Sequence, residues 1–268
     1  KISGMIDESM DKEQMAKPPK SWEFRSKPSW QRLIVMLGGV TINFILAIFI
    51  YIGLAYSYGS SSILLDSIDD GFVITNPILT DAGFRTGDKI ITVDGKKLET
   101  YSDLRKSIIG STYYQVDRDG DIIEIELPVD FLGKLSSSDD MSSFEFRMPF
   151  IIQSVSEQSL NKGYDIRQGD RIVSVNGQET KYVDQVANLL ENNSNRTILV
   201  ELLRDSFRIK KTLNVNEDGK LGIMHGATVQ NMVDLGLIDV SYNSYSFLQS
   251  IAAGTNNFVS FMGFYFDQ

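Results

Sequence analysis

The chain has 268 residues, a length that accommodates about two small domains with accessory segments. A formal net charge of −9 argues against a nucleic-acid-binding surface, which needs a basic stripe. The lack of cysteine excludes disulfides, thiolate metal ligands and thiol catalysis, and a single histidine, His225, excludes a His-Glu-x-x-His zinc motif within this sequence. No nucleophile elbow accompanies His225, so a Ser-His-Asp triad is not expected, and His225 is interpreted as a solvated turn residue.

A long apolar segment comes first in the chain. Residues 33–65 carry no charge, and residues 33–58 are predicted to form a transmembrane helix of roughly 39 Å, longer than a hydrocarbon core of about 30 Å. A buried helix of a soluble protein is the alternative, but the segment is apolar on all faces and ends among tyrosines. Basic residues precede it, so the positive-inside rule places residues 1–32 in the cytoplasm and the later residues on the other side of the membrane.

Three residues of this helix share one face. Gly39, Asn43 and Ala47 are spaced by four, one helical turn apart. Small residues allow a second helix to approach closely, and an amide within lipid requires a polar partner. This face is therefore a candidate for contact with other membrane helices, either as simple packing or beside a functional site.

The soluble part contains an internal repeat. Residues 83–95 read GFRTGDKIITVDG and residues 163–177 read GYDIRQGDRIVSVNG. The Gly-Asp-x-Ile core at residue 87 recurs 82 positions later, at residue 169. This spacing is too long for a solenoid unit and suits a small domain copied in tandem.

Each copy has the same order of predicted elements. A β-branched strand ends in a tight turn, an amphipathic helix follows, and a hairpin closes the copy. The ranges are 90–93, 101–109 and 113–127 in the first copy, and 172–175, 182–190 and 198–215 in the second. The expected fold is a membrane α-helix plus α+β: one transmembrane helix, two tandem β-rich domains and a C-terminal amphipathic helix.

This pattern resembles a bacterial PDZ domain. The resemblance predicts PDZ-like domains at 60–130 and 145–224, a flexible linker at 131–144 and an amphipathic membrane-proximal segment at 225–268. PDZ-like domains bind extended peptides or C-termini at a sheet edge beside the helix. The alternative is that one or both grooves are occluded and the domains serve as spacers or as a size filter. The candidate groove residues, with residues 146–152 as a possible strand, are Leu104, Ile108, Phe150, Ile151, Ile152, Val183 and Val186.

The chain as a whole resembles bacterial site-2 proteases of the RseP type. The segments that carry this resemblance are KISGMIDESMDKEQM, WEFRSKPSWQRLIVMLGGVTINFILA and the two PDZ-like copies after it. The resemblance implies an intramembrane zinc metalloprotease that cleaves single-span membrane proteins such as anti-sigma factors in regulated intramembrane proteolysis. It implies an inner-membrane location, periplasmic PDZ domains that screen substrates, and a position near the active site for Gly39 and Asn43.

The family's zinc ligands are not in this sequence. Its His-Glu-x-x-His helix is expected before Lys1 and its Asp ligand after Gln268, so the chain is interpreted as the middle of such a protease. Alone it is expected to have no catalytic residues, to bind no zinc and to be inactive. The alternative is a non-enzymatic, membrane-anchored PDZ adaptor that binds peptides.

Overall fold

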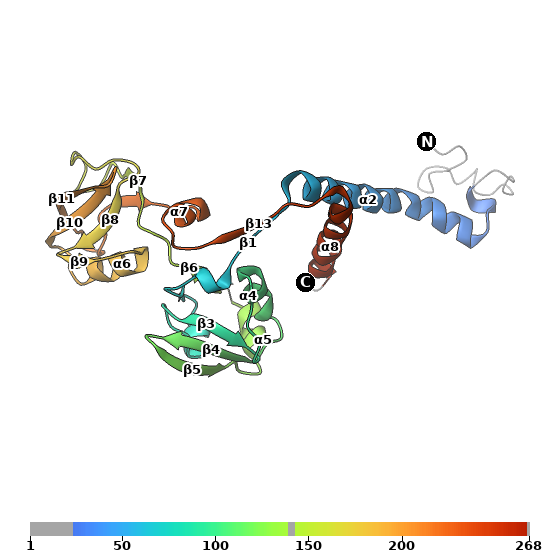
Figure 1. The fold of residues 1–268 in the computed structure, drawn as a ribbon, viewed down its shortest axis with the longest axis horizontal. Coiled ribbons are helices and arrows are strands. Elements are labelled where there is room, and N and C mark those ends of the chain that lie inside the picture. Colours follow the sequence, from blue (N-terminus) through green and yellow to red (C-terminus); the bar gives the residue numbers. More distant parts are fainter. Residues whose placement is uncertain (1–23, 139–142, 267–268) are drawn as a thin grey trace, which may run out of the picture. The chain divides into compact units, whose positions relative to one another are not determined.

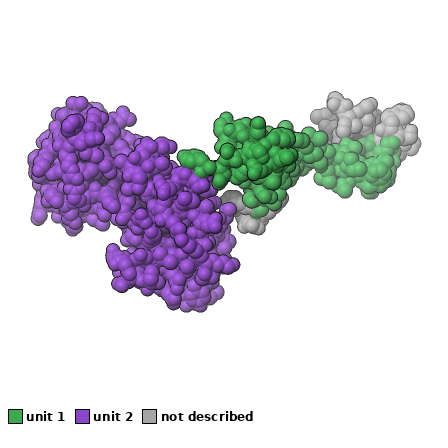
Figure 2. Space-filling model, in the orientation of Figure 1, with its two compact units in different colours: residues 1–60, 242–268 green, residues 61–241 purple. Residues whose placement is uncertain are grey.

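The computed structural model describes residues 24–138 and 143–266. Most of the predicted cytoplasmic segment, up to residue 23, lies outside this range. The chain divides into two compact units, residues 1–60 with 242–268 and residues 61–241 (Figure 2). Strands β1 (Ser60–Ile63) and β13 (Val240–Asn243) pair into a two-stranded sheet.

The first unit contains two long helices. After the short helix η1 (Phe24–Ser26), helix α2 runs from Ser29 to Tyr58, which confirms the helix predicted at residues 33–58. Helix α8 (Phe247–Phe266) packs against α2, and Phe258 makes edge-to-face contacts with Phe44 at 5.8 Å and Tyr51 at 5.9 Å (Figure 1). Among the described residues, α2 alone is long and apolar enough to cross a membrane.

The second unit contains two β-rich lobes, each with its own hydrophobic core. The first lobe is built around a core that includes Phe72, Phe84, Leu104 and Tyr114. Its strands form a three-stranded sheet in the order β3-β4-β5 and the pair β2-β6. The strands are β2 (Phe72–Val73), β3 (Lys89–Val93), β4 (Tyr113–Arg118), β5 (Asp121–Glu126) and β6 (Glu145–Phe146). The helices are η2 (Leu65–Ser67), α3 (Pro77–Asp81), α4 (Tyr101–Ser107) and α5 (Phe131–Ser136).

The second lobe is built around a core that includes Ile152, Ile172, Val186 and Leu202. Its main sheet has the order β11-β10-β8-β9, and a separate pair joins β12 to β7. The elements are β7 (Ile152–Val155), β8 (Arg171–Val175), β9 (Gln178–Glu179), α6 (Val183–Glu191), β10 (Thr197–Arg204), β11 (Phe207–Asn214) and β12 (Ile223–His225).

The repeated motif folds in the same way in both lobes. Strands β3 and β8 both end in a turn with positive φ, at Asp94-Gly95 and at Asn176-Gly177. Glycine is favoured at the second position because it has no side chain to clash there. The predicted strands, helices and hairpins of each copy are therefore present, with boundaries shifted by one or two residues.

Two segments differ from the sequence-based expectation. Residues 131–144 were expected to be a flexible linker, yet Phe131 and Leu135 of α5 and Phe144 are buried in the first core. Residues 225–268 were expected to form one amphipathic segment, yet helix α7 (Val229–Asp234) precedes α8 and its Met232 enters the first core with Ile238. Apolar side chains in these segments are buried by tertiary contacts, a driving force that local composition does not reveal.

Candidate functional site

Most of the residues predicted to line a peptide groove lie inside the cores. Leu104 of α4 and Ile108, directly after α4, are buried in the first core, and Phe150, Ile152 and Val186 are buried in the second. Val183 and Ile151 are half-buried. The buried residues support the sheets and helices but do not present a surface to a ligand, so the candidate surface lies at the sheet edges next to them.

In the second lobe the candidate edge is strand β12, which no predicted element covered. The Gly222 carbonyl accepts a hydrogen bond from the Ser156 N–H at 2.9 Å, on the β7 side. Because backbone groups alternate in direction along a strand, the N–H and carbonyl of Ile223 point to the other side. Among the described strands β12 has no second neighbour, so this edge is open. His225 thus lies in a strand, where the sequence suggested a turn.

Helix α6 belongs to the same corner of the second lobe. Its Val186 and Leu190 share the core with Leu221, and Ile223 packs against that core. A Cβ atom placed on Gly219, in the turn before β12, would lie 3.0 Å from the Glu191 Cα at the end of α6. The arrangement of an open edge strand and a neighbouring amphipathic helix can accept an extended peptide as an additional strand.

In the first lobe the corresponding edge is strand β6, which pairs with β2 through Phe72 and Phe146. Here the helix side is occupied by Tyr101, the first residue of α4. Its hydroxyl donates to the Phe144 carbonyl at 2.6 Å, and its ring centroid lies 4.3 Å from that of Phe146. The two lobes therefore differ at the edge where a peptide would add.

Five polar residues connect the two lobes, and we call Asp70, Arg147, Lys181, Tyr182 and Asp184 the interlobe cluster. The Tyr182 hydroxyl donates to Asp70 Oδ2 at 2.6 Å, and Lys181 Nζ lies 3.1 Å from the same oxygen. Arg147 donates to Asp184 at 2.6 Å and to the Asp70 carbonyl at 3.0 Å, with its guanidinium 4.7 Å from the Tyr182 ring centroid.

The charges of the interlobe cluster shift two pKa values. Burial alone would raise the pKa of Asp70, but the hydrogen bonds from Tyr182 and Lys181 outweigh it and lower that pKa. Burial, followed by the hydrogen bond to Asp70, raises the pKa of Tyr182 far above its usual value. Asp70 is therefore ionised and Tyr182 protonated at neutral pH, the states that their hydrogen bond requires.

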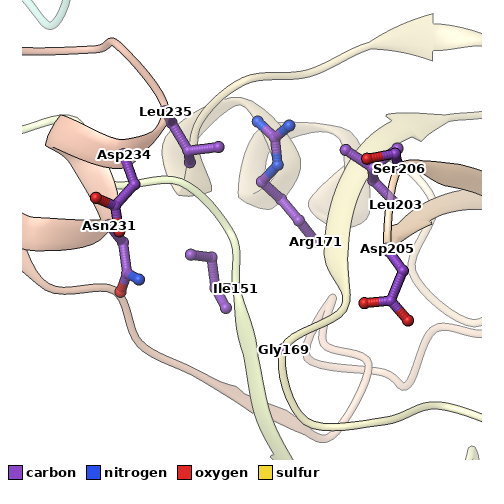
Figure 3. Close-up of a pocket in the computed structure, with 9 residues that line it drawn as sticks. All are labelled: Ile151, Gly169, Arg171, Leu203, Asp205, Ser206, Asn231, Asp234 and Leu235. Carbon is purple, nitrogen blue, oxygen red and sulfur yellow. The ribbon is translucent and has the colours of Figure 1, made fainter.

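A cavity of about 230 Å³ lies in the second unit between the second lobe and α7 (Figure 3). Arg171 extends from β8 toward Leu235, while Asp234 lies across the cavity on α7. Burial, and then the neighbouring Arg208, lower the pKa of Arg171. One guanidinium with two nearby carboxylates, Asp205 and Asp234, gives this cavity no clear preference for the charge of a ligand.

The described residues do not form a zinc site. Within residues 24–138 and 143–266 there is no group of three His, Cys, Asp or Glu side chains that could hold a metal ion. The His225 ring instead lies 4.6 Å from the Phe150 ring, and burial lowers its pKa. His225 is therefore neutral at neutral pH, and it remains solvent-exposed while one side of its ring contacts Phe150.

The three residues of the membrane-helix motif are not equally exposed: Ala47 is half-buried, whereas Gly39 and Asn43 are open. Asn43 and Gly39 are exposed, and no heavy atom of the described chain lies within 4 Å of a Cβ placed on Gly39. Helix α8 contacts other residues of α2, among them Phe44, Tyr51 and Tyr56. The face that carries Gly39 and Asn43 is therefore uncovered by the described residues.

An apolar helix joined to two β-rich lobes defines a membrane-associated class of protein, and comparison with known families specifies it further. The family model of peptidase family M50 matches residues 3–267, so the chain belongs to this family. The site-2 protease resemblance found in the sequence is thereby confirmed.

Three curated relatives carry the printed description "Putative zinc metalloprotease". The Staphylococcus aureus protein is 28% identical over 113 residues, 41% of this chain and 25% of its own length. The Brucella suis protein is 28% identical over 107 residues, 38% of this chain and 27% of its own length. The Helicobacter pylori protein is 28% identical over 120 residues, 44% of this chain and 33% of its own length. The matched part is thus a quarter to a third of each relative.

Two solved structures were also found. The PDZ domain of an SdrC-like protein from Listeria innocua has a TM-score of 0.27 and 16% identity, covering 30% of this chain and 97% of that domain. The PDZ domain of the corresponding Listeria monocytogenes protein has a TM-score of 0.26 and 12% identity, covering 34% of this chain and 97% of that domain. These TM-scores are too low to establish a shared fold.

Two features of the candidate peptide edges, strand β12 and Tyr101, are not predicted from the sequence. Strand β12 is three residues long and follows a loop, so its periodicity carries no signal. Tyr101 begins a predicted helix and has no motif that marks it. Alignment of the two copies at a spacing of 82 residues makes it equivalent to Val183. The difference between tyrosine at this position of the first copy and valine in the second is the sequence signal that the two edges differ.

Proposed function

We propose that this chain is the middle portion of an intramembrane zinc metalloprotease that cleaves single-span membrane proteins. The observation that carries the proposal is the match to peptidase family M50 across residues 3–267, together with the apolar helix α2. The zinc would be held by parts of the intact protein other than the described residues, and it would activate a water molecule for peptide hydrolysis.

In this proposal α2 crosses the bacterial inner membrane. Basic residues just before the helix, including Lys27 and Arg32, favour a cytoplasmic N-terminal side by the positive-inside rule. Both lobes would then lie in the periplasm. The exposed Gly39 and Asn43 of α2, with the half-buried Ala47 beside them, would contact other transmembrane helices of the same protease, because small residues allow close packing and the Asn43 amide needs a polar partner in lipid.

The two lobes act in this proposal as PDZ-like domains that screen substrates by peptide binding. Support comes from the repeated Gly-Asp-x-Ile core and from the open edge of β12 beside α6. An extended segment of a substrate would pair with the backbone of Ile223 and add a strand to the β7-β12 pair. Anti-sigma-factor-like proteins that have already been trimmed on the periplasmic side are the proposed substrates.

The test uses the intact gene that contains this chain, expressed in bacteria with a single-span reporter protein. We expect cleavage within the reporter's span, loss of cleavage when zinc is chelated, and a preference for reporters with a trimmed periplasmic part. An Ile223→Pro variant, which removes an outward N–H from β12, is expected to reduce that preference while zinc-dependent cleavage persists. Phe207→Ser, at an exposed residue of β11 in the same lobe, is the matched control.

Retention of peptide binding without any zinc-dependent cleavage would contradict the protease proposal. That outcome would instead support a membrane-anchored adaptor that binds peptides. An unchanged substrate preference in Ile223→Pro would contradict only the screening role of β12. The protease proposal would stand, because the selectivity would then arise elsewhere in the protein.

A further inference from the structure

The two lobes carry different residues at one equivalent position beside the edge strand. The buried residues Leu104, in α4, and Ile108, at its C-cap, correspond, 82 positions later, to the buried α6 residues Val186 and Leu190. By the same spacing Tyr101 corresponds to Val183. A tyrosine thus begins the helix in the first lobe where a valine begins it in the second.

The edge strands can be aligned through their partners. The Phe72 N–H donates to the Asp88 carbonyl, and the Ile152 N–H donates to the Asp170 carbonyl, so β2 and β7 are equivalent. Phe72 pairs with Phe146, and Ile152 pairs with His225. Counted along the edge segment, Phe144, which directly precedes β6, corresponds to Ile223, each lying two residues before the aligned residue. The β7–β12 pair has a register shift between Met224 and His225, so the two segments are aligned along the edge and not across the pair.

In the first lobe the outward backbone group at this position is already bonded. The Phe144 carbonyl accepts the Tyr101 hydroxyl at 2.6 Å, and the Tyr101 ring lies against Phe146 at 4.3 Å and near Phe72 at 5.9 Å. An added peptide strand would need the same carbonyl as its hydrogen-bond acceptor and the same space that the ring fills. Burial raises the pKa of Tyr101, so its hydroxyl remains a donor at neutral pH.

At the equivalent edge of the second lobe, the described part of the chain shows no such contact. Val183 carries no hydrogen-bond donor on its side chain, and its backbone N–H is directed to the Met148 carbonyl at 2.9 Å. The next strand residue, Met224, is 62% exposed. The backbone of Ile223 is therefore available to a peptide, whereas that of Phe144 is not.

We propose that Tyr101 closes the peptide edge of the first lobe, so that an extended peptide adds only to β12 of the second lobe. We call the hydrogen bond to Phe144 with the ring contact to Phe146 the Tyr101 cap. This inference rests on the proposed peptide-binding function and specifies which copy performs it. The partner is an extended peptide segment, recognised mainly through its backbone.

The first experiment measures the Tyr101 cap without a ligand. Amide hydrogen exchange is recorded on the full chain in detergent for the wild type, Tyr101→Phe and Tyr101→Val. Tyr101→Phe keeps the ring and removes the donor, so it tests the hydroxyl even if Tyr101→Val is poorly folded. The reporter is the Glu145 amide, which faces β2 in the Val73–Glu145 pair, and we expect its exchange to accelerate roughly fivefold in Tyr101→Phe and further in Tyr101→Val. Tyr113→Phe, which removes an exposed hydroxyl bonded to Glu126 in the same lobe, should change nothing at Glu145.

The second experiment locates peptide binding. The probe is a peptide selected on the full chain from a library of random decapeptides with free C-termini. In the wild type we expect one bound peptide and exchange protection at residues 223–225. Tyr101→Val should add a second bound peptide with protection at residues 144–146. The reciprocal variant Val183→Tyr should weaken binding at β12.

The outcomes separate the two proposals. Peptide protection at residues 144–146 in the wild type, or no second site in the Tyr101→Phe and Tyr101→Val variants, would overturn the closure by Tyr101 while leaving peptide binding intact. Failure to select any peptide on any variant would overturn the peptide-binding function itself, and the selectivity inference with it.

Discussion

Arg118 donates to both carboxylate oxygens of Asp88, from Nε to Oδ1 at 2.7 Å and from Nη2 to Oδ2 at 2.8 Å. The second lobe repeats this pair at Arg204 and Asp170, with both distances 2.7 Å. Both carboxylates are 1% exposed. The aspartate of the repeated Gly-Asp motif is therefore a structural residue that joins the turn before β3 or β8 to the end of β4 or β10.

We predict that Arg118→Met destabilises the first lobe by about 3–5 kcal/mol, because it leaves the Asp88 carboxylate buried without its partner. The free energy of unfolding can be measured by urea denaturation followed by circular dichroism. Lys97→Met is the control, since Lys97 pairs with Asp66 on the surface and its loss should cost less than about 1 kcal/mol. Equal effects of the two substitutions would contradict the structural role of the buried pair.

The second lobe should lose stability in acid. Burial alone would raise the pKa of Asp170, but the hydrogen bonds from Arg204 and the Arg167 N–H lower it below the usual 3.8. A lowered folded-state pKa means that the stabilisation is fully present above the unfolded pKa of about 4 and is lost as pH falls through the folded value. Hydrogen bonds from Arg167 and then Arg204 also lower the pKa of the neighbouring Asp165 to about 2.

We therefore expect amide protection in β8 and β10 to fall between about pH 4 and pH 2 in the wild type. In Asp170→Asn, which cannot titrate, this dependence should be flatter and the lobe less stable at neutral pH. A protection profile in the wild type that is independent of pH in this window would refute the linkage.

The interlobe cluster should hold the two lobes in their observed arrangement. Asp70→Ala removes the acceptor of the Tyr182 hydroxyl and the partner of Lys181, so we expect faster amide exchange at the start of α6. Small-angle X-ray scattering should show a broader distribution of lobe separations. Asp66→Ala, in a nearby exposed ion pair, is the control and should leave both measurements unchanged.

Gly254 should be essential for the packing of α8 on α2. A Cβ atom at Gly254 would lie 2.5 Å from the Ile52 Cα, whereas one at Gly263 would have no heavy atom within 4 Å. Gly254→Leu should therefore separate the helices, and Gly263→Leu should not. Since the chain has no cysteine, cross-linking between cysteines placed at residues 44 and 258 reports the contact. Equal cross-linking in the two variants would contradict the close approach.

The sequence by itself determined the elements that depend on local pattern. The uncharged run of α2, the turns at Asp94-Gly95 and Asn176-Gly177 and the alternating hairpins all follow from periodicity and turn chemistry within a few residues. The internal repeat also showed that the same unit occurs twice. Together with the segments at 1–15 and 22–47, these features carry the resemblance to the family.

Only the tertiary structure decided which side chains face a ligand. Leu104 and Val186 carry the apolar pattern of a groove but are buried, while Ile223 belongs to an edge strand formed by pairing with the distant β7. Helix α7 follows the second lobe in the chain, yet its Met232 is buried in the core of the first lobe. Edge pairing, burial and the Tyr101 cap depend on contacts between residues far apart in the chain, and local sequence pattern carries no information about such contacts.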